Sequence, residues 1–307
     1  MSSDNLNLQW GSSFRLTASE KWKAKSAAMG RDVTEALVDY AKPAPGMHIL
    51  DLASGTGEPA ITLAGRIGRS GHITALDLSA ELLEIAAHRA RQRGFTKVAV
   101  LQADAQALPF PDNTFDLGTA RFGVMFFSDV VRALGELHRV LKPKSRACFV
   151  VWGPLEQPYW STTIGLVHKH VGGDLLVEGG PNPFRFAEPG SLSTVLRKAG
   201  FVDVEEENRT VPWTWPGTVE EVWEQHQAVG TPFLPMLRRV PTEKWPAINA
   251  EVHAAVSKYQ DGEGIKFGAT IVLASGRKSS SWRLASSTVV IPALMGLAVR
   301  ACTTWPI

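Results

Sequence analysis

The stretch MHILDLASGTGEPAITLA, residues 47–64, joins an apolar run to a turn of small residues and then to a helical pattern. The glycines at positions 55 and 57 lack the Cβ atoms that would keep a ligand away from the backbone. Pro59 is compatible with the first turn of a helix, where its missing N–H group has no partner to lose. Because a helix start carries unpaired N–H groups and a partial positive charge, the stretch predicts a strand, a tight turn and a helix around a small polar ligand.

Strand-like and helix-like segments alternate after this turn. The predicted strands cover residues 71–77, 98–101, 115–121, 146–152, 201–204 and 266–274, and the predicted helices include 79–94, 128–141 and 191–199. Strands that alternate with helices in this way predict a parallel sheet covered by helices on both faces. We therefore expect an α/β fold with seven strands in a doubly wound sheet.

The composition divides the chain into segments. Residues 1–45 are expected to form an N-terminal helical cap, residues 46–153 the ligand-binding core, and residues 154–278 the remainder of the sheet. Two insertions in this last segment, 155–188 and 206–262, are rich in proline, glycine and tryptophan or helical in pattern. We expect these insertions to form a helical lid over the ligand.

Residues 279–307 have no clear helical or strand boundaries. Their apolar run, residues 289–299, is interrupted by Pro292 and is shorter than the roughly 18 residues that a membrane-spanning helix needs. We interpret the segment as a weakly ordered or non-native appendage, and we expect its deletion to leave folding and activity nearly unchanged. An interfacial membrane anchor is the alternative interpretation.

Charge and composition argue against several classes of protein. The formal net charge is +2 over 307 residues, and the basic residues are scattered, so a nucleic-acid-binding groove is not supported. The N-terminus has no basic region followed by an apolar stretch, which argues against a secretory signal. No cluster of His, Cys, Asp and Glu has the spacing of a metal site. We expect a cytoplasmic protein without a metal, without nucleic acid and without stable membrane insertion.

Three features follow the ends of neighbouring predicted strands, where open α/β sheets bind ligands. The first is the glycine turn. The second is Asp77, twenty residues after Gly57 (77 − 57 = 20), where a carboxylate can accept hydrogen bonds from both hydroxyls of a ribose. The third is Asp104-Ala105, where a carboxylate and a backbone N–H group can bind the edge of an adenine. Together the three features predict a ligand that contains adenosine.

The glycine turn leaves the class of ligand open. Residues 55–60, GTGEPA, also fit the G-x-G-x-x-A form of a dinucleotide-binding turn, in which an acid about twenty residues later is expected as well. An NAD(P)-dependent oxidoreductase is therefore one alternative. A non-catalytic module that binds an adenosyl ligand is another.

A wider set of motifs resembles one family. LDLASGTGEPA, the acid of ALDLS, ADAQALPFPDNTFD and ELHRVLKP look like the successive motifs of class I S-adenosylmethionine-dependent methyltransferases, above all those of the ubiquinone/menaquinone-biosynthesis type. The resemblance covers about residues 30–153, and residues 266–278 are similar to the seventh, antiparallel strand of that fold. It implies a Rossmann-like sheet, S-adenosyl-L-methionine as cofactor and methyl transfer to a small molecule.

The resemblance also implies roles for single residues. Asp51 would orient the turn and the ammonium group of the cofactor, and Asp77 would bind its ribose. The cofactor-binding residues implied in this way are Asp51, Ala53, Ser54, Gly55, Gly57, Asp77, Leu78, Asp104, Ala105, Arg121 and Phe122. Ala53 stands where the family most often has glycine. Simpler interpretations stay open: Asp51 as a strand-end cap, Asp77 as a charge at a helix N-terminus, Asp104 as a loop acid, and Arg121 as the partner of Asp129.

Methyl transfer is an in-line displacement, for which the protein mainly supplies alignment and a dry pocket. We expect the N-terminal helices and the two lid insertions to form the acceptor site. The insertions hold five of the ten tryptophans, and aromatic rings suit an aromatic, quinone-like or isoprenoid acceptor. The expected substrate residues are Phe122, Met125, Trp160 and His168. The candidate bases are His168 and His170, of which at most one is expected to face the pocket, because their i, i+2 spacing places them on different faces of a helix. The acceptor atom, the need for a base and the oligomeric state stay open.

Overall fold

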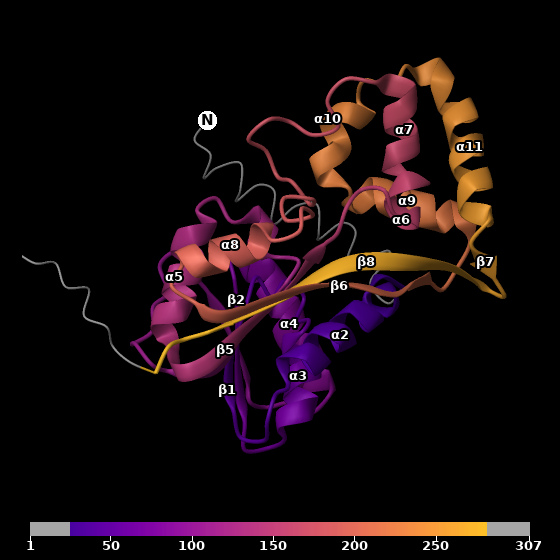
Figure 1. The fold of residues 1–307 in the computed structure, drawn as a ribbon. Helices are drawn as coiled ribbons and strands as arrows, with labels where there is room; N and C mark the ends of the chain where they lie inside the picture. Colours follow the sequence, from indigo (N-terminus) through magenta and orange to yellow (C-terminus); the bar gives the residue numbers. More distant parts are fainter. Residues whose placement is uncertain (1–24, 281–307) are drawn as a thin grey trace, which may run out of the picture.

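The computed structural model of this chain describes residues 25–280, which are built on one mixed β-sheet (Figure 1). The strands are β1 (His48–Leu52), β2 (His72–Asp77), β3 (Val98–Gln102), β4 (Phe115–Arg121), β5 (Leu141–Trp152), β6 (Val202–Trp215), β7 (Gln260–Asp261) and β8 (Gly264–Arg277). They are arranged in the order β3-β2-β1-β4-β5-β8-β6, and the two-residue β7 pairs with β8. The predicted seven-stranded sheet is confirmed, and β7 adds a short eighth strand.

The directions of the strands bring several of their carboxyl ends to the same edge of the sheet. The pairs β1–β2, β1–β4, β2–β3 and β4–β5 are parallel, whereas β8 is antiparallel to both β5 and β6. The expected antiparallel last strand is therefore confirmed. Because β6 runs in the same direction as β5, the carboxyl ends of β1, β4, β5 and β6 lie along the same edge.

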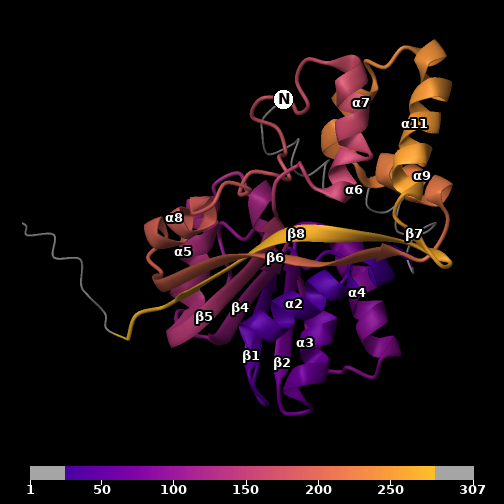
Figure 2. The same ribbon diagram turned by 45° about the vertical axis from the view of Figure 1, so that its right-hand side comes forward.

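Helices cover both faces of the sheet. The helices next to the sheet are α2 (Arg31–Ala41), α3 (Ala60–Ile67), α4 (Ala80–Gln92), α5 (Val130–Val140) and α8 (Ser191–Lys198). Contacts join α2 to α3 and α3 to α4 on one face, and α5 to α8 on the other (Figures 1 and 2). Apolar strand residues such as Ile49, Leu50 and Leu52 are fully buried between the two helical layers. Burial on both faces explains why these strands are nearly continuous apolar runs.

The two insertions pack together above the carboxyl-end edge. Their helices are α6 (Pro158–Ser161), α7 (Ile164–Val171), α9 (Val219–Val229), α10 (Leu234–Leu237) and α11 (Trp245–Ser257). Figure 1 shows them as one group at the upper right, beyond the sheet. A hydrogen bond of 2.8 Å from Trp223 Nε1 to Asn249 Oδ1 ties α9 to α11. Thr218 and Glu221 form the capping box that begins α9.

The second insertion begins later than the sequence predicts. Residues 206–215, which were expected to belong to the lid, continue β6 and pair with β8 as far as Trp215 and Ile265. Val211, Trp213 and Trp215 are buried on one face, which is the period-two pattern of a strand. Pro212 lies in the strand without disrupting the sheet because β6 is an edge strand, where a missing N–H group costs no ladder hydrogen bond.

The described chain ends shortly after Lys278. Its Nζ atom donates hydrogen bonds of 2.8 Å to the carbonyl oxygens of Arg139 and Leu141 and to Asn113 Oδ1, which fixes the end of β8 against the end of α5. The N-terminal cap is described only from residue 25, with residues 25–29 helical ahead of α2. The appendage expected at 279–307 lies outside the described residues beyond position 280. Between residues 25 and 280, no helix is both long and apolar enough to cross a membrane.

Candidate functional site

The ends of β1, β2 and β3 are tied together by hydrogen bonds. Ser54 N donates to Leu76 O at 2.9 Å, and Ala103 N donates to Asp77 O at 3.1 Å. The backbone nitrogen of Gly55 donates to Asp77 Oδ2 at 2.8 Å. The glycine turn, the acid after β2 and the loop after β3 are therefore neighbours in space, as the positions of the three motifs predict.

Asp51 lies beneath the turn and is completely buried. Its carboxylate accepts hydrogen bonds from Ser54 Oγ at 2.6 Å and from Thr119 Oγ1 at 2.7 Å. Desolvation raises the pKa of Asp51 to about 7, although these two hydroxyls and the charge of Arg121 lower it. Asp51 thus holds the turn in place from below and does not line the cavity above it.

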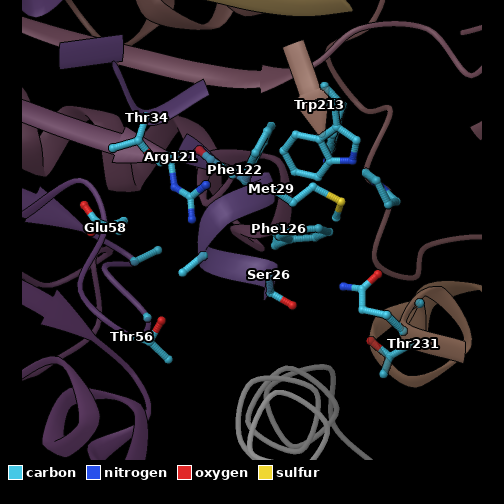
Figure 3. A pocket seen from close by; sticks show the side chains of 18 of the residues that line it. Ser26, Met29, Thr34, Thr56, Glu58, Arg121, Phe122, Phe126, Trp213 and Thr231 are labelled. Carbon is cyan, nitrogen blue, oxygen red and sulfur yellow. Dashed lines mark hydrogen bonds between the residues drawn. The ribbon is translucent and has the colours of Figure 1, made fainter. Parts of the chain in front are cut away.

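A cavity of about 360 Å³ opens between the turn, the N-terminal helices and the lid. At one end it is lined by Ala53, Ser54, Gly55 and Thr56. Arg89 and Glu58 form an ion pair there at 3.4 Å, and Arg89 Nη1 donates to Thr56 O at 2.6 Å. Figure 3 shows Thr56 and Glu58 on one side of this space and Trp213 and Thr231 on the other. The turn and the lid therefore share a single cavity.

The opposite end of the cavity, here called the aromatic chamber, is built from the ends of β4, β5 and β6 together with the lid. Its residues are Phe122, Trp152, Tyr159, Trp160, Trp213, Gln225, His226 and Phe233. Phe122 and Trp152 are stacked with ring centroids 4.6 Å apart and an interplanar angle of 12°. The ring of Trp213 meets Trp152 edge-on at 4.9 Å. Such a chamber offers apolar faces and ring edges to a planar group.

His226 is the main residue of this chamber that the sequence analysis did not select. It is 1 % exposed, and neither of its ring nitrogens has a hydrogen-bond partner among residues 25–280. Desolvation lowers the pKa of His226 to about 3, so the imidazole is neutral at physiological pH. His226 follows the buried Val222 by four residues on α9, and this spacing on the apolar face is the signal that could have identified it.

The structure brings together some of the expected site residues. Those that line the cavity are Ala53, Ser54, Gly55, Arg121, Phe122, Met125 and Trp160. Asp77 and Gly57 lie behind the turn, where a Cβ atom on Gly57 would come within 2.7 Å of Ile61 Cδ1. Asp104, Ala105 and the exposed Leu78 lie beyond the cavity on the side of β3. The Asp104 carboxylate accepts a hydrogen bond from Gln106 N at 2.8 Å.

The geometry bears on two expectations about side-chain direction. His168 does not reach the cavity: its Nε2 atom is hydrogen-bonded to Gly173 O at 2.7 Å near the end of α7. Arg121 lines the cavity, with its guanidinium carbon 5.6 Å from the ring centroid of Phe122. Asp129, the alternative partner of Arg121, caps α5 by accepting a hydrogen bond from Arg132 N at 3.0 Å.

The donors and acceptors around the turn suit an adenosyl amino acid. Each oxygen of Asp77 accepts one backbone N–H, from Gly55 at 2.8 Å and from Ser79 at 3.0 Å. A carboxylate has about four acceptor positions, so Asp77 retains capacity for ribose hydroxyls. Cationic and anionic side chains both line the turn end of the cavity, which matches a ligand that carries an ammonium group and a carboxylate.

Comparisons with known proteins agree with this geometry. The model of the ubiE/COQ5 methyltransferase family matches residues 21–172. The ubiquinone/menaquinone biosynthesis C-methyltransferase UbiE of Brucella abortus (strain S19) is 33% identical over 201 residues, which are 60% of this chain and 74% of that protein. The 2-phytyl-1,4-naphtoquinone methyltransferase of Nostoc sp. (strain PCC 7120) is 39% identical over 117 residues, which are 38% of this chain and 51% of that protein.

Solved structures support the fold. The YcgJ protein of Bacillus subtilis superimposes with a TM-score of 0.53 at 20% identity, covering 81% of this chain and 98% of that chain. A putative methyltransferase of Bacillus halodurans gives a TM-score of 0.51 at 22% identity, covering 80% and 98%. The fold, the shared motifs and the curated relative together identify the class of protein. The chain belongs to the ubiE/COQ5 methyltransferase family and is a methyltransferase that uses S-adenosylmethionine.

Proposed function

We propose that this chain transfers the methyl group of S-adenosylmethionine to a small aromatic or quinone-like acceptor held in the aromatic chamber. One observation carries the proposal: a single cavity has the glycine turn at one end and stacked aromatic rings at the other. A planar acceptor packed against these rings would lie next to the cofactor end of the same space. The names of the two relatives, which refer to quinones, agree with such an acceptor.

The cofactor is assigned to the ends of β1, β2 and β3. In this proposal Asp77 binds the ribose, and Asp104 with Ala105 binds the adenine. The methionine part is lined by Ala53, Ser54 and Gly55. The hydrogen bond from Ala103 N to Asp77 O supports the adenine assignment, because it holds the loop after β3 beside the ribose-binding acid. The anionic Glu58 lines the same cavity and suits the ammonium group of the cofactor. The cationic Arg89 and Arg121 suit its carboxylate.

For methyl transfer the protein must align the acceptor with the methyl group and exclude water from the site. When bound, S-adenosylmethionine supplies an electrophilic methyl group on a sulfonium. Phe122 and Trp152 offer parallel ring faces, which fix the plane of an aromatic acceptor and stabilise a nearby cation. Trp160, Trp213 and Phe233 are nearly completely buried and keep water from this end of the cavity. Orientation of this kind contributes several kcal/mol, on the order of 7–11 in the best-aligned systems.

Two measurements test the proposal. Calorimetric titration with S-adenosylhomocysteine and, separately, with NAD is expected to show binding of the first only. The purified chain is then incubated with S-adenosylmethionine and a panel that comprises a hydroquinone, a naphthol, an isoprenoid alcohol and an aliphatic amine. Mass spectrometry is expected to show a mass gain of one methyl group on the aromatic compounds.

Each contrary result has a separate meaning. Preference for NAD would contradict the cofactor assignment and favour the oxidoreductase alternative. Binding of S-adenosylhomocysteine without any methylated product would favour a non-catalytic module. Methylation of the amine or the isoprenoid alcohol alone would leave the enzyme class intact and refute the aromatic acceptor.

A further inference from the structure

Four polar side chains of the aromatic chamber have atoms without a hydrogen-bond partner in the described part of the chain. These atoms are Trp160 Nε1, Trp213 Nε1, Gln225 Oε1 and both ring nitrogens of His226. All four residues are at most 7 % exposed, and all four line the cavity. A buried polar group without a partner destabilises the folded protein, so a cluster of them in one cavity points to a ligand that completes their hydrogen bonds.

The four groups are complementary in type. The two indole N–H groups can only donate, Gln225 Oε1 can only accept, and a neutral imidazole donates from one nitrogen and accepts at the other. None of the eight chamber residues is Asp, Glu, Lys or Arg; the charged side chains of the cavity, Glu58, Arg89 and Arg121, come from other positions on its wall. The chamber therefore suits a neutral planar molecule that carries a hydroxyl or carbonyl group.

Burial keeps the imidazole of His226 neutral and also weakens it as a base, so proton transfer to it depends on the negative charge that develops on the acceptor oxygen beside it. The rings around His226 are Tyr159 on α6 at 5.1 Å, Trp160 at 5.3 Å, Trp223 at 5.9 Å and Phe233 at 6.3 Å. Tyr159 is the titratable group among them, and burial raises its pKa, so it also stays neutral. Desolvation is the only cause of the lowered pKa of His226, and no nearby charge contributes to it.

We propose that His226 binds a hydroxyl group of the methyl acceptor and takes its proton during the reaction. This inference rests on the proposed function and assigns a catalytic residue within it. The O–H bond of the acceptor breaks, its electron pair stays on the oxygen, and an N–H bond forms on the imidazole. The activated acceptor bonds to the methyl carbon while the methyl–sulfur bond leaves its electron pair on sulfur. An imidazolium and a thioether thus replace an imidazole and a sulfonium, and the total charge is unchanged.

The position of His226 in the chain strengthens the case that it belongs to this protein's acceptor site. The family model ends at residue 172, whereas Trp213, Gln225 and His226 lie beyond it on β6 and α9. The cofactor end of the cavity comes mainly from the matched region. Residues outside that region are suited to define which acceptor is bound.

The first experiment compares the acceptor reaction of the wild type with that of His226→Gln, which keeps a polar side chain but cannot take a proton. The expected loss is about 10²- to 10⁴-fold in kcat, as for removal of a general base. The loss should shrink as pH rises toward the pKa of the acceptor hydroxyl, because acceptor that is already ionised needs no base. A purely structural histidine would not produce this pH dependence. His253→Gln, on α11 and outside the cavity, is the matched control and should keep wild-type rates.

The second experiment needs no turnover. The protein saturated with S-adenosylhomocysteine is titrated with 2-naphthol and with naphthalene, with tryptophan fluorescence as the signal. We expect the wild type to bind 2-naphthol at least tenfold more tightly, and His226→Phe to lose this preference while still binding naphthalene. Equal wild-type affinities for the two probes would overturn the inference.

The outcomes separate this inference from the proposed function. If the wild type methylates aromatic acceptors and His226→Gln keeps its rate within twofold, His226 is not the base, and the proposed function stands. If the wild type methylates no aromatic acceptor, the proposed function is refuted, and with it the role of His226 as the base. Binding of S-adenosylhomocysteine to each variant, within twofold of the wild type, verifies that the variants are folded.

Discussion

Ala53 and Gly123 are matched in volume: a Cβ atom on Gly123 would lie 2.5 Å from the Cβ atom of Ala53. Ala53 adopts a φ of 52°, which explains why glycine is common at this position of the turn in the family that it resembles. The alanine is tolerated here because its neighbour after β4 has no side chain. The turn and the segment after β4 are therefore coupled through one methyl group.

This contact predicts a compensating pair of substitutions. Gly123→Ala should destabilise the protein by about 1–3 kcal/mol, as expected for overpacking, because the two methyl groups cannot both fit. Ala53→Gly in the same chain should recover most of the loss by restoring the space. Urea unfolding of the two single variants and the double variant measures the coupling. Additive effects within about 0.5 kcal/mol would show that the two positions are independent.

Asp77 is expected to stabilise both the turn and the cofactor. Asp77→Asn leaves one carbonyl oxygen where two carboxylate oxygens now accept from Gly55 N and Ser79 N. We expect binding of S-adenosylhomocysteine to weaken by about 1.5–3 kcal/mol, or about 10- to 150-fold, as for loss of hydrogen bonds to a charged group. Isothermal titration calorimetry checks this value. Glu84→Gln, an exposed acid-to-amide change on α4, is the control, and unchanged binding by Asp77→Asn would refute the ribose assignment.

His226 should make folding stability depend on pH. Its pKa is 6.5 in the unfolded chain and about 3 in the folded protein, so between these values the unfolded chain binds the proton more tightly. Stability is therefore complete above pH 6.5 and falls as the pH drops. At pH 5 the wild type should have lost about 2 kcal/mol through this residue, at 1.36 kcal/mol per pH unit.

The comparison with His226→Gln isolates this contribution from that of other titrating groups. The buried Asp51, with a pKa raised to about 7, acts in the opposite direction and loses stability as the pH rises from 4 to 7. Because Asp51 is present in both proteins, its effect cancels in the difference. Denaturant unfolding at pH 7.5 and pH 5.0 should therefore show a smaller loss for the variant, and equal losses would contradict the burial of a neutral imidazole.

Gly57 is expected to tolerate no side chain. Its φ is 107°, and a Cβ atom would lie 2.7 Å from Ile61 Cδ1 and 3.2 Å from Ala86 Cβ. Gly68 also has a positive φ, of 70°, but a Cβ atom there would meet nothing within 4 Å. Gly57→Ala should therefore lower the melting temperature more than Gly68→Ala, which carries the backbone strain alone. Equal shifts would show that close packing at Gly57 contributes nothing.

Lys278 should matter for stability although it lies at the end of the sheet. Lys278→Met removes the donor to Arg139 O, Leu141 O and Asn113 Oδ1, of which Leu141 O is in a buried position. The expected loss is about 1–3 kcal/mol. The control is Lys266→Met, which removes an exposed ion pair with Asp261 and should change stability by less than about 1 kcal/mol. Urea unfolding of both variants tests the difference.

Much of the core could be predicted from local sequence. Short apolar runs bounded by turn residues define β1 to β4, since strands buried on both faces need continuous apolar sequence. The order of motifs then places Gly55, Asp77 and Asp104 at adjacent strand ends, because parallel strands share one edge. The prediction was less accurate for β6, whose strand was expected to end at residue 204 and whose residues 206–215 were expected to belong to the lid. Only pairing with β8 at the sheet edge allows the strand to continue to Trp215.

The choice of histidine shows the limit of such reasoning. His168 and His226 both lie on helices of the lid, and sequence spacing alone does not reveal which one faces the cavity. Nε2 of His168 is hydrogen-bonded to the carbonyl oxygen of Gly173 at 2.7 Å, whereas the packing of α9 buries His226 among aromatic rings. By itself, then, the sequence determined the α/β core and the meeting of the three motifs at neighbouring strand ends, because those depend on short-range patterns and fixed strand direction. The aromatic chamber was decided only by tertiary structure, since its residues come from the ends of β4, β5 and β6 and from the lid, which meet through long-range packing.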